Sequence, residues 1–318
     1  MTRIPRLPAA PILAGDPAAE PALAAAAAGP GMMLLTGADA ALGLDPDIRP
    51  RLLKLFALPD PALRALARAK FEPANRNVYR GAFPAQPGDV TYKRGADLGP
   101  DLADPARADP ADPLTEPTPA PDPAQLPGWR EDAAAYHAAM ERLGRALLRA
   151  LARGFGLDAA ALDARFEGGI STLRLLDYPE RPADAAIPDD ARLPGEARTV
   201  VGRAHRDNGF VTLLWQDPQG GLQARTPDGA WADVPPEPGA LAVNFGRLLA
   251  DLTGGRACAT EHRVLGGRAA RTSIPFFLEP AVDAPIETAA GPRPYGDLLW
   301  ERMKDFVEFR GVERRPAA

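Results

Sequence analysis

The sequence has little cysteine, little histidine and no long apolar run: one cysteine and three histidines occur in 318 residues. A single thiol, Cys258, cannot form an internal disulfide, so nothing requires an oxidising compartment and a cytoplasmic location is expected. We expect this thiol to be a small core residue. No stretch reaches the roughly 18 uninterrupted apolar residues of a membrane-spanning helix, and the alanine run at 24–28 is too short for a secretion signal.

An excess of positive charge is also absent. The formal net charge is -5, from 37 Lys and Arg against 42 Asp and Glu, and there is no long basic run. Such a chain offers no electrostatic footprint for nucleic acid or for an anionic membrane surface. Because 46% of the residues are hydrophobic, the chain has enough apolar side chains to form a packed core. We expect a globular monomer or weak homodimer whose partner is a small-molecule substrate.

Proline and glycine are abundant, with 37 and 30 residues. Helical spacing is found at 17–28, at 46–70 (both interrupted by prolines) and at Glu131–Gly154, with a short strand expected at Met32–Leu35. The Pro-rich stretch at about 96–127 predicts an extended, solvated loop. His137 lies on the third helix without another ligand-type residue at ligand spacing, so we expect a surface or half-buried structural histidine.

After Leu157 the sequence changes to short apolar or β-branched segments separated by turn signals. The expected strands are Ser171–Tyr178, Thr199–Ala204, Phe210–Trp215, Gly221–Ala224, Leu241–Phe245, Ala257–Val264 and Thr272–Leu278, and a last helix is expected at Tyr295–Phe309. This strand density favours an antiparallel sandwich or barrel. The expected fold is a mostly β core with flanking helices (α+β). We divide the chain into a helix-rich N-terminal region (1–160), a β domain (165–281) and a C-terminal region (282–318) whose helix packs back on the core.

Two of the three histidines lie in the strand-rich half. In His205-Arg206-Asp207, residues i and i+2 of a strand point to the same face, so an imidazole and a carboxylate converge there. Taken alone, this triplet is also typical of a surface ion pair. Two histidines and one aspartate form the facial triad of non-haem iron(II), which leaves three coordination positions open, and His262 is the second histidine available. Zinc is not excluded by these ligands alone.

His262 is followed by Gly266-Gly267, which is typical of a two-residue hairpin turn. If Leu265 pairs with Arg268, then His262 faces Arg271 across the ladder, and Thr260 faces Ser273. An inward guanidinium needs an anion because an unpaired buried charge loses several kcal/mol of solvation. Its planar fork suits a carboxylate. The open iron positions suit a chelating co-substrate and dioxygen, and the arginine would hold the far end of the chelator.

Three stretches carry a family resemblance: "HRDNGFVTLLWQDPQGGLQ", "WADVPPEPGALAVNFGRLLADLTGG" and "EHRVLGGRAARTSIPFFLEP". Over residues 170–280 the chain resembles the isopenicillin N synthase-like branch of the 2-oxoglutarate and iron(II)-dependent oxygenases. The resemblance implies a double-stranded β-helix (jelly roll). It implies that the iron ligands are His205, Asp207 and His262. It further implies that Arg271 and Ser273 grip the distal carboxylate of 2-oxoglutarate and that Tyr178, in "LLDYP", helps to bind this co-substrate.

The implied reaction uses Fe(II), 2-oxoglutarate and O2 to oxidise a small organic substrate, by hydroxylation, desaturation or cyclisation, with release of succinate and CO2. Because Asp207 occupies the carboxylate position, the pattern argues against a halogenase. Leu176 and Arg247 stand where many members have Asn and Asp, and the family's "GPNxWP" segment is missing. The candidate substrate-binding residues are Arg76, Asn77 and Tyr79 in "NRNVYRG", together with Arg174, Phe210 and Phe277.

Several interpretations stay open from the sequence. Core packing is favoured over substrate contact for Phe210 and Phe277, whereas Arg174 suits a surface acid as well as a substrate carboxylate. An oxidase of the isopenicillin N synthase type, which uses no 2-oxoglutarate, has the same fold and would use Arg271 and Ser273 for a substrate carboxylate. A non-catalytic barrel that binds a small acid is the alternative of a different class.

Overall fold

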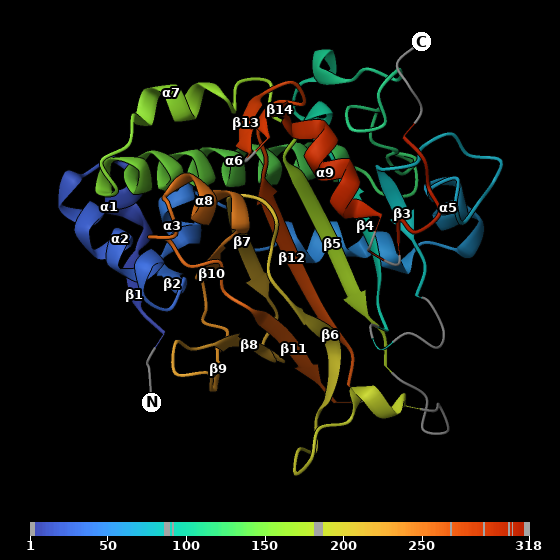
Figure 1. The fold of residues 1–318 in the computed structure, drawn as a ribbon. Helices are drawn as coiled ribbons and strands as arrows, with labels where there is room; N and C mark the ends of the chain where they lie inside the picture. Colours follow the sequence, from blue (N-terminus) through green and yellow to red (C-terminus); the bar gives the residue numbers. More distant parts are fainter. Residues whose placement is uncertain are drawn as a thin grey trace.

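Two β-sheets face each other at the centre of the molecule (Figure 1). The computed structural model describes residues 4–85, 90, 92–180, 187–267, 269–288, 290–304, 306 and 308–314. The larger sheet has the order β1 (Arg6–Pro8), β2 (Met32–Thr36), β10 (Leu241–Phe245), β7 (Val211–Gln216), β12 (Arg271–Leu278), β5 (Thr172–Tyr178), β4 (Arg94–Leu98) and β3 (Gly81–Phe83). The smaller sheet has the order β6 (Thr199–His205), β11 (His262–Gly266), β8 (Leu222–Arg225) and β9 (Trp231–Asp233). A separate hairpin pairs β13 (Pro285–Thr288) with β14 (Gly291–Pro294).

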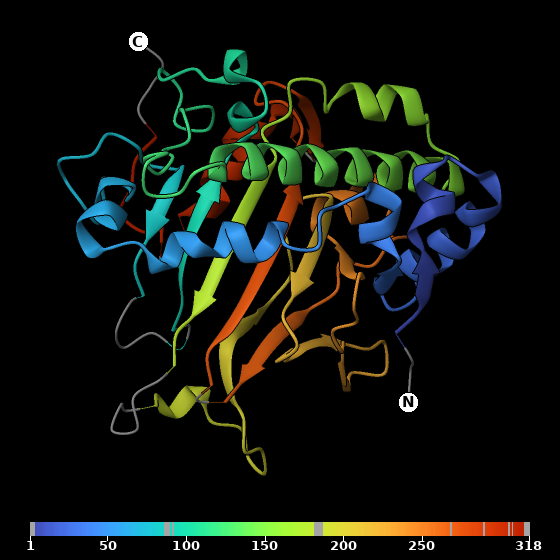
Figure 2. The same ribbon diagram turned by 180° about the vertical axis from the view of Figure 1, so that it is seen from behind.

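Helices cover the outer face of the larger sheet, with the long α6 (Trp129–Gly154) lying across it (Figure 2). The other helices are α1 (Ala9–Leu13), α2 (Glu20–Ala28), α3 (Ala38–Leu42), α4 (Ile48–Leu53), α5 (Asp60–Ala65), α7 (Ala159–Ala164), α8 (Arg247–Leu252) and α9 (Tyr295–Met303). Among the described residues, no helix combines the length and the apolar composition that crossing a membrane requires.

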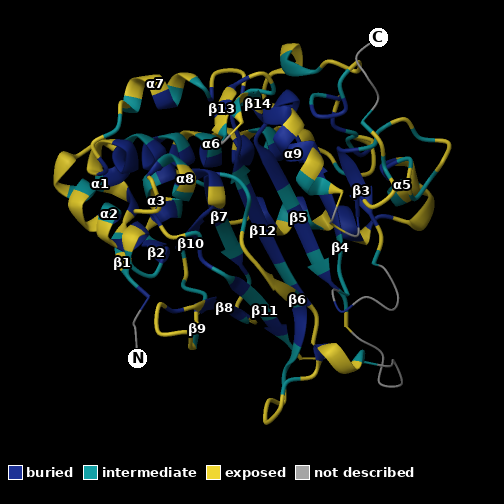
Figure 3. Cartoon of the chain, in the orientation of Figure 1, coloured by how far each residue is buried: buried dark blue, intermediate teal, exposed yellow. Residues whose placement is uncertain are grey.

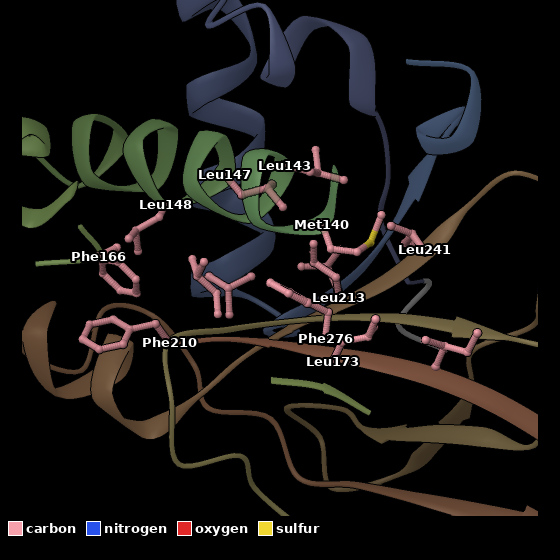
Figure 4. Close-up of a cluster of buried hydrophobic side chains, with 14 of the residues drawn as sticks. Met140, Leu143, Leu147, Leu148, Phe166, Leu173, Phe210, Leu213, Leu241 and Phe276 are labelled. Carbon is pink, nitrogen blue, oxygen red and sulfur yellow. The ribbon is translucent and has the colours of Figure 1, made fainter. Parts of the chain in front are cut away.

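The main core lies between α6 and the larger sheet (Figure 4). Met140, Leu143 and Leu147 of α6 point toward Leu213 and Phe276 of the sheet. All five side chains are almost fully buried, and each contributes about 1.5–3 kcal/mol relative to exposure. Burial colouring shows the same pattern, with dark blue strands and exposed outer surfaces on the helices (Figure 3). This packing makes the larger sheet a rigid support for its opposite face.

Strand alternation decides what the opposite face carries. On β12, Ile274, Phe276 and Leu278 belong to the core under α6, so the residues between them face the smaller sheet. The same alternation on β5, β7, β10 and β12 gives this inner face a set of polar side chains: Arg174, Thr212, Gln216, Asn244, Arg271 and Ser273. The space between the sheets is therefore lined by groups that can bind a polar ligand.

The predicted fold class is confirmed, as a double-stranded β-helix core with flanking helices. Leu241–Phe245 is observed with its predicted bounds, and most other predicted strands shift by one residue. The strand predicted to start at Ala257 starts instead at His262, and the last helix ends at Met303 rather than Phe309. The strands β1, β3, β4, β9, β13 and β14 were not predicted. The division at 160 and 282 stays a prediction.

Three local predictions were wrong. The Pro-rich stretch contains part of β4 and two 3₁₀ turns, Pro100–Leu102 and Pro105–Arg107, and buries Asp101, which accepts hydrogen bonds from both polar groups of Thr118. Hydrogen bonds between polar side chains and the backbone thus allow a loop rich in polar residues and proline to pack against the protein. His137 is completely buried, and its Nε2 lies 3.1 Å from the Ser171 carbonyl oxygen. This hydrogen bond lowers the cost of burying the imidazole. Cys258 is exposed.

The predicted hairpin register is also wrong. β11 pairs with β6 and β8, whereas β12 pairs with β5 and β7, so His262 and Arg271 come from opposing sheets. Arg268 lies outside the described residues. Thr260 precedes β11 and its hydroxyl donates to the Pro30 carbonyl at 2.6 Å. The chain passes from the smaller sheet to the larger one after Gly266-Gly267. A turn signal in the sequence does not show whether the strands on either side of it pair with each other or join different sheets.

Candidate metal and co-substrate site

The two strand-borne histidines meet at the aspartate. β6 and β11 are antiparallel, and their ladder pairs His205 directly with His262. The imidazole centroids are 4.3 Å apart. The Nε2 atoms of His205 and His262 lie 3.5 Å and 3.7 Å from Oδ1 of Asp207. One ligand atom from each residue lies within 4.8 Å of the others, so a single metal ion can bridge all three.

Backbone carbonyls orient both imidazoles. Nδ1 of His205 lies 2.8 Å from the Arg203 carbonyl, and Nδ1 of His262 lies 3.1 Å from the Thr260 carbonyl. Because each Nδ1 donates to a carbonyl oxygen, each Nε2 keeps its lone pair for a metal. The histidines therefore present the tautomer that a metal site needs.

Two residues of the larger sheet hold the carboxylate of Asp207. Thr212 of β7 donates its hydroxyl to Oδ2 at 2.5 Å, and Asn244 of β10 donates its amide to the same oxygen at 2.7 Å. Thr212 and Asn244 are paired residues of neighbouring strands, so they reach the carboxylate from one face. Because Oδ2 accepts both hydrogen bonds, Oδ1 is the oxygen that faces the two imidazoles. Sequence reasoning missed both donors, although a polar residue within the apolar run of β10 was a usable signal.

The electrostatics fit a cation at this position. Burial alone would raise the pKa of Asp207, but His262, His205 and the Thr212 hydrogen bond hold that pKa well below its ordinary value. Burial disfavours the charged form of His205, yet the hydrogen bond and the charge of Asp207 outweigh it and raise this pKa. The pKa of His262 is lowered, mainly by burial. A divalent ion would replace the proton that Asp207 attracts to His205.

One side of the site is open. The side chain of His205 is 42% exposed, whereas those of His262 and Asp207 are 9% and 10% exposed. Two neutral imidazole nitrogens and one carboxylate oxygen on one side of an ion match the facial triad, which leaves positions for other ligands. The donor set thus fits iron(II) and leaves room for a chelating co-substrate.

Arg271 lies buried on the inner face of the opposing sheet. Its Nε donates to the Gly220 carbonyl at 2.7 Å and its Nη1 lies 3.4 Å from the Ser273 hydroxyl. The guanidinium carbon is 4.7 Å from the ring centroid of Tyr178, its partner across β5 and β12. A pocket opens beside Arg271 and Tyr178 and is also lined by Val201 of β6 and by the Gly266-Gly267 turn. The predicted co-substrate residues are therefore brought together, at a place that can receive a carboxylate.

The predicted substrate residues separate into groups. Phe210 packs edge to face on Phe166 in the main core, 5.2 Å between ring centroids, so its environment is a structural one (Figure 4). Arg76 is exposed, and Asn77 donates to the Pro117 carbonyl. Tyr79 is buried against Phe309, 5.5 Å between ring centroids.

Phe277 and Arg174 remain on the inner face. Phe277 is the ladder partner of Thr212, the residue that holds Asp207. The guanidinium carbon of Arg174 lies 5.8 Å from the ring centroid of Phe277, and Arg174 makes a bidentate ion pair with Asp97. The acid that Arg174 meets is therefore a buried one of the same sheet and not a surface acid.

Comparison with known proteins agrees with this geometry. The sequence model of the 2OG-Fe(II) oxygenase superfamily matches residues 171–280. Isopenicillin N synthase of Streptomyces clavuligerus is 31% identical over 237 residues, which cover 73% of this chain and 70% of that protein. A 2-oxoglutarate-Fe(II) type oxidoreductase of Aspergillus fumigatus is 36% identical over 165 residues, 51% of this chain and 46% of the relative. The match thus spans less than half the length of the Aspergillus protein.

A solved structure shares the whole fold. A Neurospora crassa protein in complex with alpha-KG and 5-formyluracil superposes with a TM-score of 0.75 at 25% identity, covering 95% of this chain and 96% of that one. Family model, relative and fold agree with the His-Asp-His geometry. The chain belongs to the isopenicillin N synthase-like branch of the 2OG-Fe(II) oxygenase superfamily.

Proposed function

We propose that the chain is an iron(II)- and 2-oxoglutarate-dependent oxygenase that oxidises a small organic substrate by hydroxylation, desaturation or cyclisation. The observation that carries the proposal is the convergence of two imidazole nitrogens on one oxygen of Asp207, whose other oxygen is already hydrogen-bonded. His205, Asp207 and His262 would hold the iron. When bound, iron(II) with 2-oxoglutarate activates O2 to oxidise a substrate C–H bond, and succinate and CO2 are released.

The protein's own groups have distinct roles in this proposal. Arg271 and Ser273 hold the distal carboxylate of 2-oxoglutarate, and the Tyr178 ring packs against the Arg271 guanidinium. The carbonyls of Arg203 and Thr260 keep the imidazoles in the metal-binding tautomer. Thr212 and Asn244 keep the carboxylate aimed. Fixed positions of this kind lower the cost of ordering the reactants.

A second candidate is an iron(II) oxidase that takes its electrons from the substrate and uses no 2-oxoglutarate. It is favoured by one observation: the isopenicillin N synthase relative aligns with 73% of this chain, against 51% for the Aspergillus oxidoreductase. In that case Arg271 and Ser273 would hold a substrate carboxylate. A non-catalytic barrel that binds a small acid would bind its ligand without dependence on iron.

Succinate formation separates these functions. Purified protein with iron(II), ascorbate and 2-oxoglutarate is incubated in air, and oxygen uptake and succinate are measured together. We expect succinate in proportion to oxygen consumed, and its loss in Asp207→Ala and Arg271→Ala. Arg293→Ala, which removes an exposed partner of Glu301, is the matched control and should behave as the unchanged protein. Absence of succinate under every substrate tried would instead favour the oxidase.

Location and assembly complete the proposal. We propose a cytoplasmic protein that is a monomer or a weak homodimer, in which regions 1–160 and 282–318 support the oxygenase domain 165–281. The single cysteine, which rules out an internal disulfide, supports a reducing compartment. Sedimentation at two protein concentrations tests the assembly, since a stable higher oligomer would contradict it.

A further inference from the structure

A buried cluster of charge lies beside the inner face of the larger sheet, outside the predicted metal and co-substrate residues. It contains three cations and two carboxylates: Arg68, Lys93, Arg174, Asp97 and Glu308. The side chains of Arg68 and Asp97 are 0% exposed and that of Glu308 is 4% exposed. The cluster, which we call the basic cluster, has a formal charge of +1. Buried charge is costly unless each group is paired, so the excess cation calls for an anion.

Arg68 has unused hydrogen-bond donors. One nitrogen, Nη2, pairs with Oδ2 of Asp97. Arg174 already takes both oxygens of Asp97, through Nε at 2.6 Å and Nη2 at 2.8 Å. Nε and Nη1 of Arg68 are fully buried and find no partner among the described residues. A buried charged donor left unpaired is costly, so these two atoms point to an acceptor that the described residues do not supply.

Glu308 and Phe309, which follow α9 in the chain, contact this cluster. The guanidinium carbon of Arg68 lies against two aromatic rings, 4.8 Å from the centroid of Phe83 and 4.3 Å from that of Phe309. Glu308 brings a carboxylate to 3.2 Å from Nζ of Lys93. Burial would raise the pKa of Glu308, but Lys93 and Arg174 lower it to about 2, so it is ionised at neutral pH. A carboxylate next to an aromatic ring thus occupies the approach to Arg68.

The basic cluster and the candidate metal site share one face of three neighbouring strands. Thr212 of β7, which holds Asp207, is paired with Phe277 of β12. Phe277 is paired in turn with Thr172 of β5, two residues from Arg174 and on the same face. The step from Thr212 to Thr172 is two interstrand spacings, about 10 Å, and Asp97 with its partner Arg68 lies one strand further, at β4. A small molecule lying over Phe277 could therefore reach both the metal site and the cations.

We propose that the basic cluster binds the carboxylate of the substrate, in competition with the Glu308 carboxylate for Lys93. The inference rests on the proposed function, because it places the substrate beside the iron. The substrate class is a small carboxylic acid with an apolar or aromatic body, which would lie over Phe277 between the cations and the metal site. Arg68, Lys93 and Arg174 are binding residues in this scheme.

Binding of a probe pair tests the proposal without turnover. The full-length protein is titrated calorimetrically with 3-phenylpropionate and with its uncharged amide. We expect the carboxylate to bind at least tenfold more tightly than the amide. Glu308→Gln should tighten carboxylate binding several-fold by removing the competing charge. Glu301→Gln, an exposed acid of α9 paired with Arg293, is the matched control and should change nothing.

Loss of the cations should remove the preference. In Arg68→Met and in Lys93→Met we expect the acid and the amide to bind alike. Arg68 is buried and its loss can destabilise the chain, whereas Lys93 is 17% exposed, so Lys93→Met keeps the test decisive if Arg68→Met does not fold. An equal affinity for acid and amide in Glu308→Gln, no binding of either, or a preserved preference in Lys93→Met would overturn the proposal.

Failure of the proposed function looks different. If the chain does not use 2-oxoglutarate, succinate is absent in every variant, while the preference for the acid over the amide is still measured. If only the basic cluster is misassigned, succinate forms from 2-oxoglutarate as before, and the calorimetric preference is missing.

Discussion

Thr212→Val should weaken iron binding without disturbing the co-substrate end of the site. The Thr212 hydroxyl donates to Oδ2 of Asp207 at 2.5 Å, and Asn244 supplies the second donor to this oxygen. Valine has nearly the same shape, so the substitution removes one donor and leaves the packing of β7 in place. The carboxylate then loses part of the restraint that aims Oδ1 at His205 and His262.

Two independent estimates of the loss in iron-binding free energy agree. A hydrogen bond to a charged group contributes about 1.5–3 kcal/mol. Removing a partner that orients a metal ligand typically lowers metal affinity 10- to 100-fold, or about 1.4–2.7 kcal/mol. The pKa of Asp207 should rise, because the Thr212 hydrogen bond helps to lower it, but His262 still favours the ionised form. We therefore expect iron(II) affinity to fall 10- to 100-fold with the site still ionised at neutral pH.

The assay is anaerobic titration of the apoprotein with iron(II) in competition with a coloured chelator. Thr272→Val is the control, since the Thr272 hydroxyl lies on the other face of β12 and donates to Oδ2 of Asp217 at 3.2 Å. Asn244→Leu removes the second donor, and the double variant should lose less than the sum of the two, because both donors serve one oxygen. Iron affinity unchanged in both Thr212→Val and Asn244→Leu would refute the view that these residues aim the carboxylate.

Three further predictions concern single groups. Asp207→Ala should abolish iron-dependent turnover with the circular dichroism spectrum intact, and retained succinate formation would remove Asp207 from the ligand set. Arg271→Ala should weaken 2-oxoglutarate binding by about 2–5 kcal/mol, as for truncating one member of a buried charged pair, and an unaltered dissociation constant would argue against that contact. Burial lowers the pKa of His137 from 6.5 to about 3, so the unfolded chain binds the proton first and stability falls as pH drops below 6.5. His137 should lower the free energy of unfolding by about 2 kcal/mol at pH 5 relative to pH 8, and the difference between the two pH values should shrink by about this amount in His137→Gln, which a pH series of urea titrations checks.

The sequence predicted best where local pattern and local structure coincide. Leu241–Phe245 is an apolar run after a Pro-Gly turn, and its bounds match the observed β10. The closeness of His205 and Asp207 was predicted from strand alternation, but β6 ends at His205, so the two side chains meet at the end of the strand and not within it. By contrast, β3 and β9 are three residues long, too short for any period to be recognised.

Tertiary pairing explains what sequence reasoning missed. The turn at Gly266-Gly267 indicates a reversal, but only the assembled sheets decide that His262 and Arg271 belong to different ones. Arg68 and Asp97 are 29 residues apart and each is typical of a solvated surface when taken alone. Their burial depends on β4, which was not predicted, and on Phe309, which follows the last helix. Neither the composition of β4 nor that of the residues around Phe309 indicates that these segments contact Arg68.

The most direct test of the site is an anaerobic titration of the apoprotein with iron(II) and 2-oxoglutarate, followed by visible absorption. Chelation of the metal by 2-oxoglutarate should produce a charge-transfer band in the unchanged protein, no band in Asp207→Ala, and a band that needs far more 2-oxoglutarate in Arg271→Ala. A band of equal intensity in Asp207→Ala, or none in the unchanged protein at saturating iron and 2-oxoglutarate, would contradict the assignment of this site.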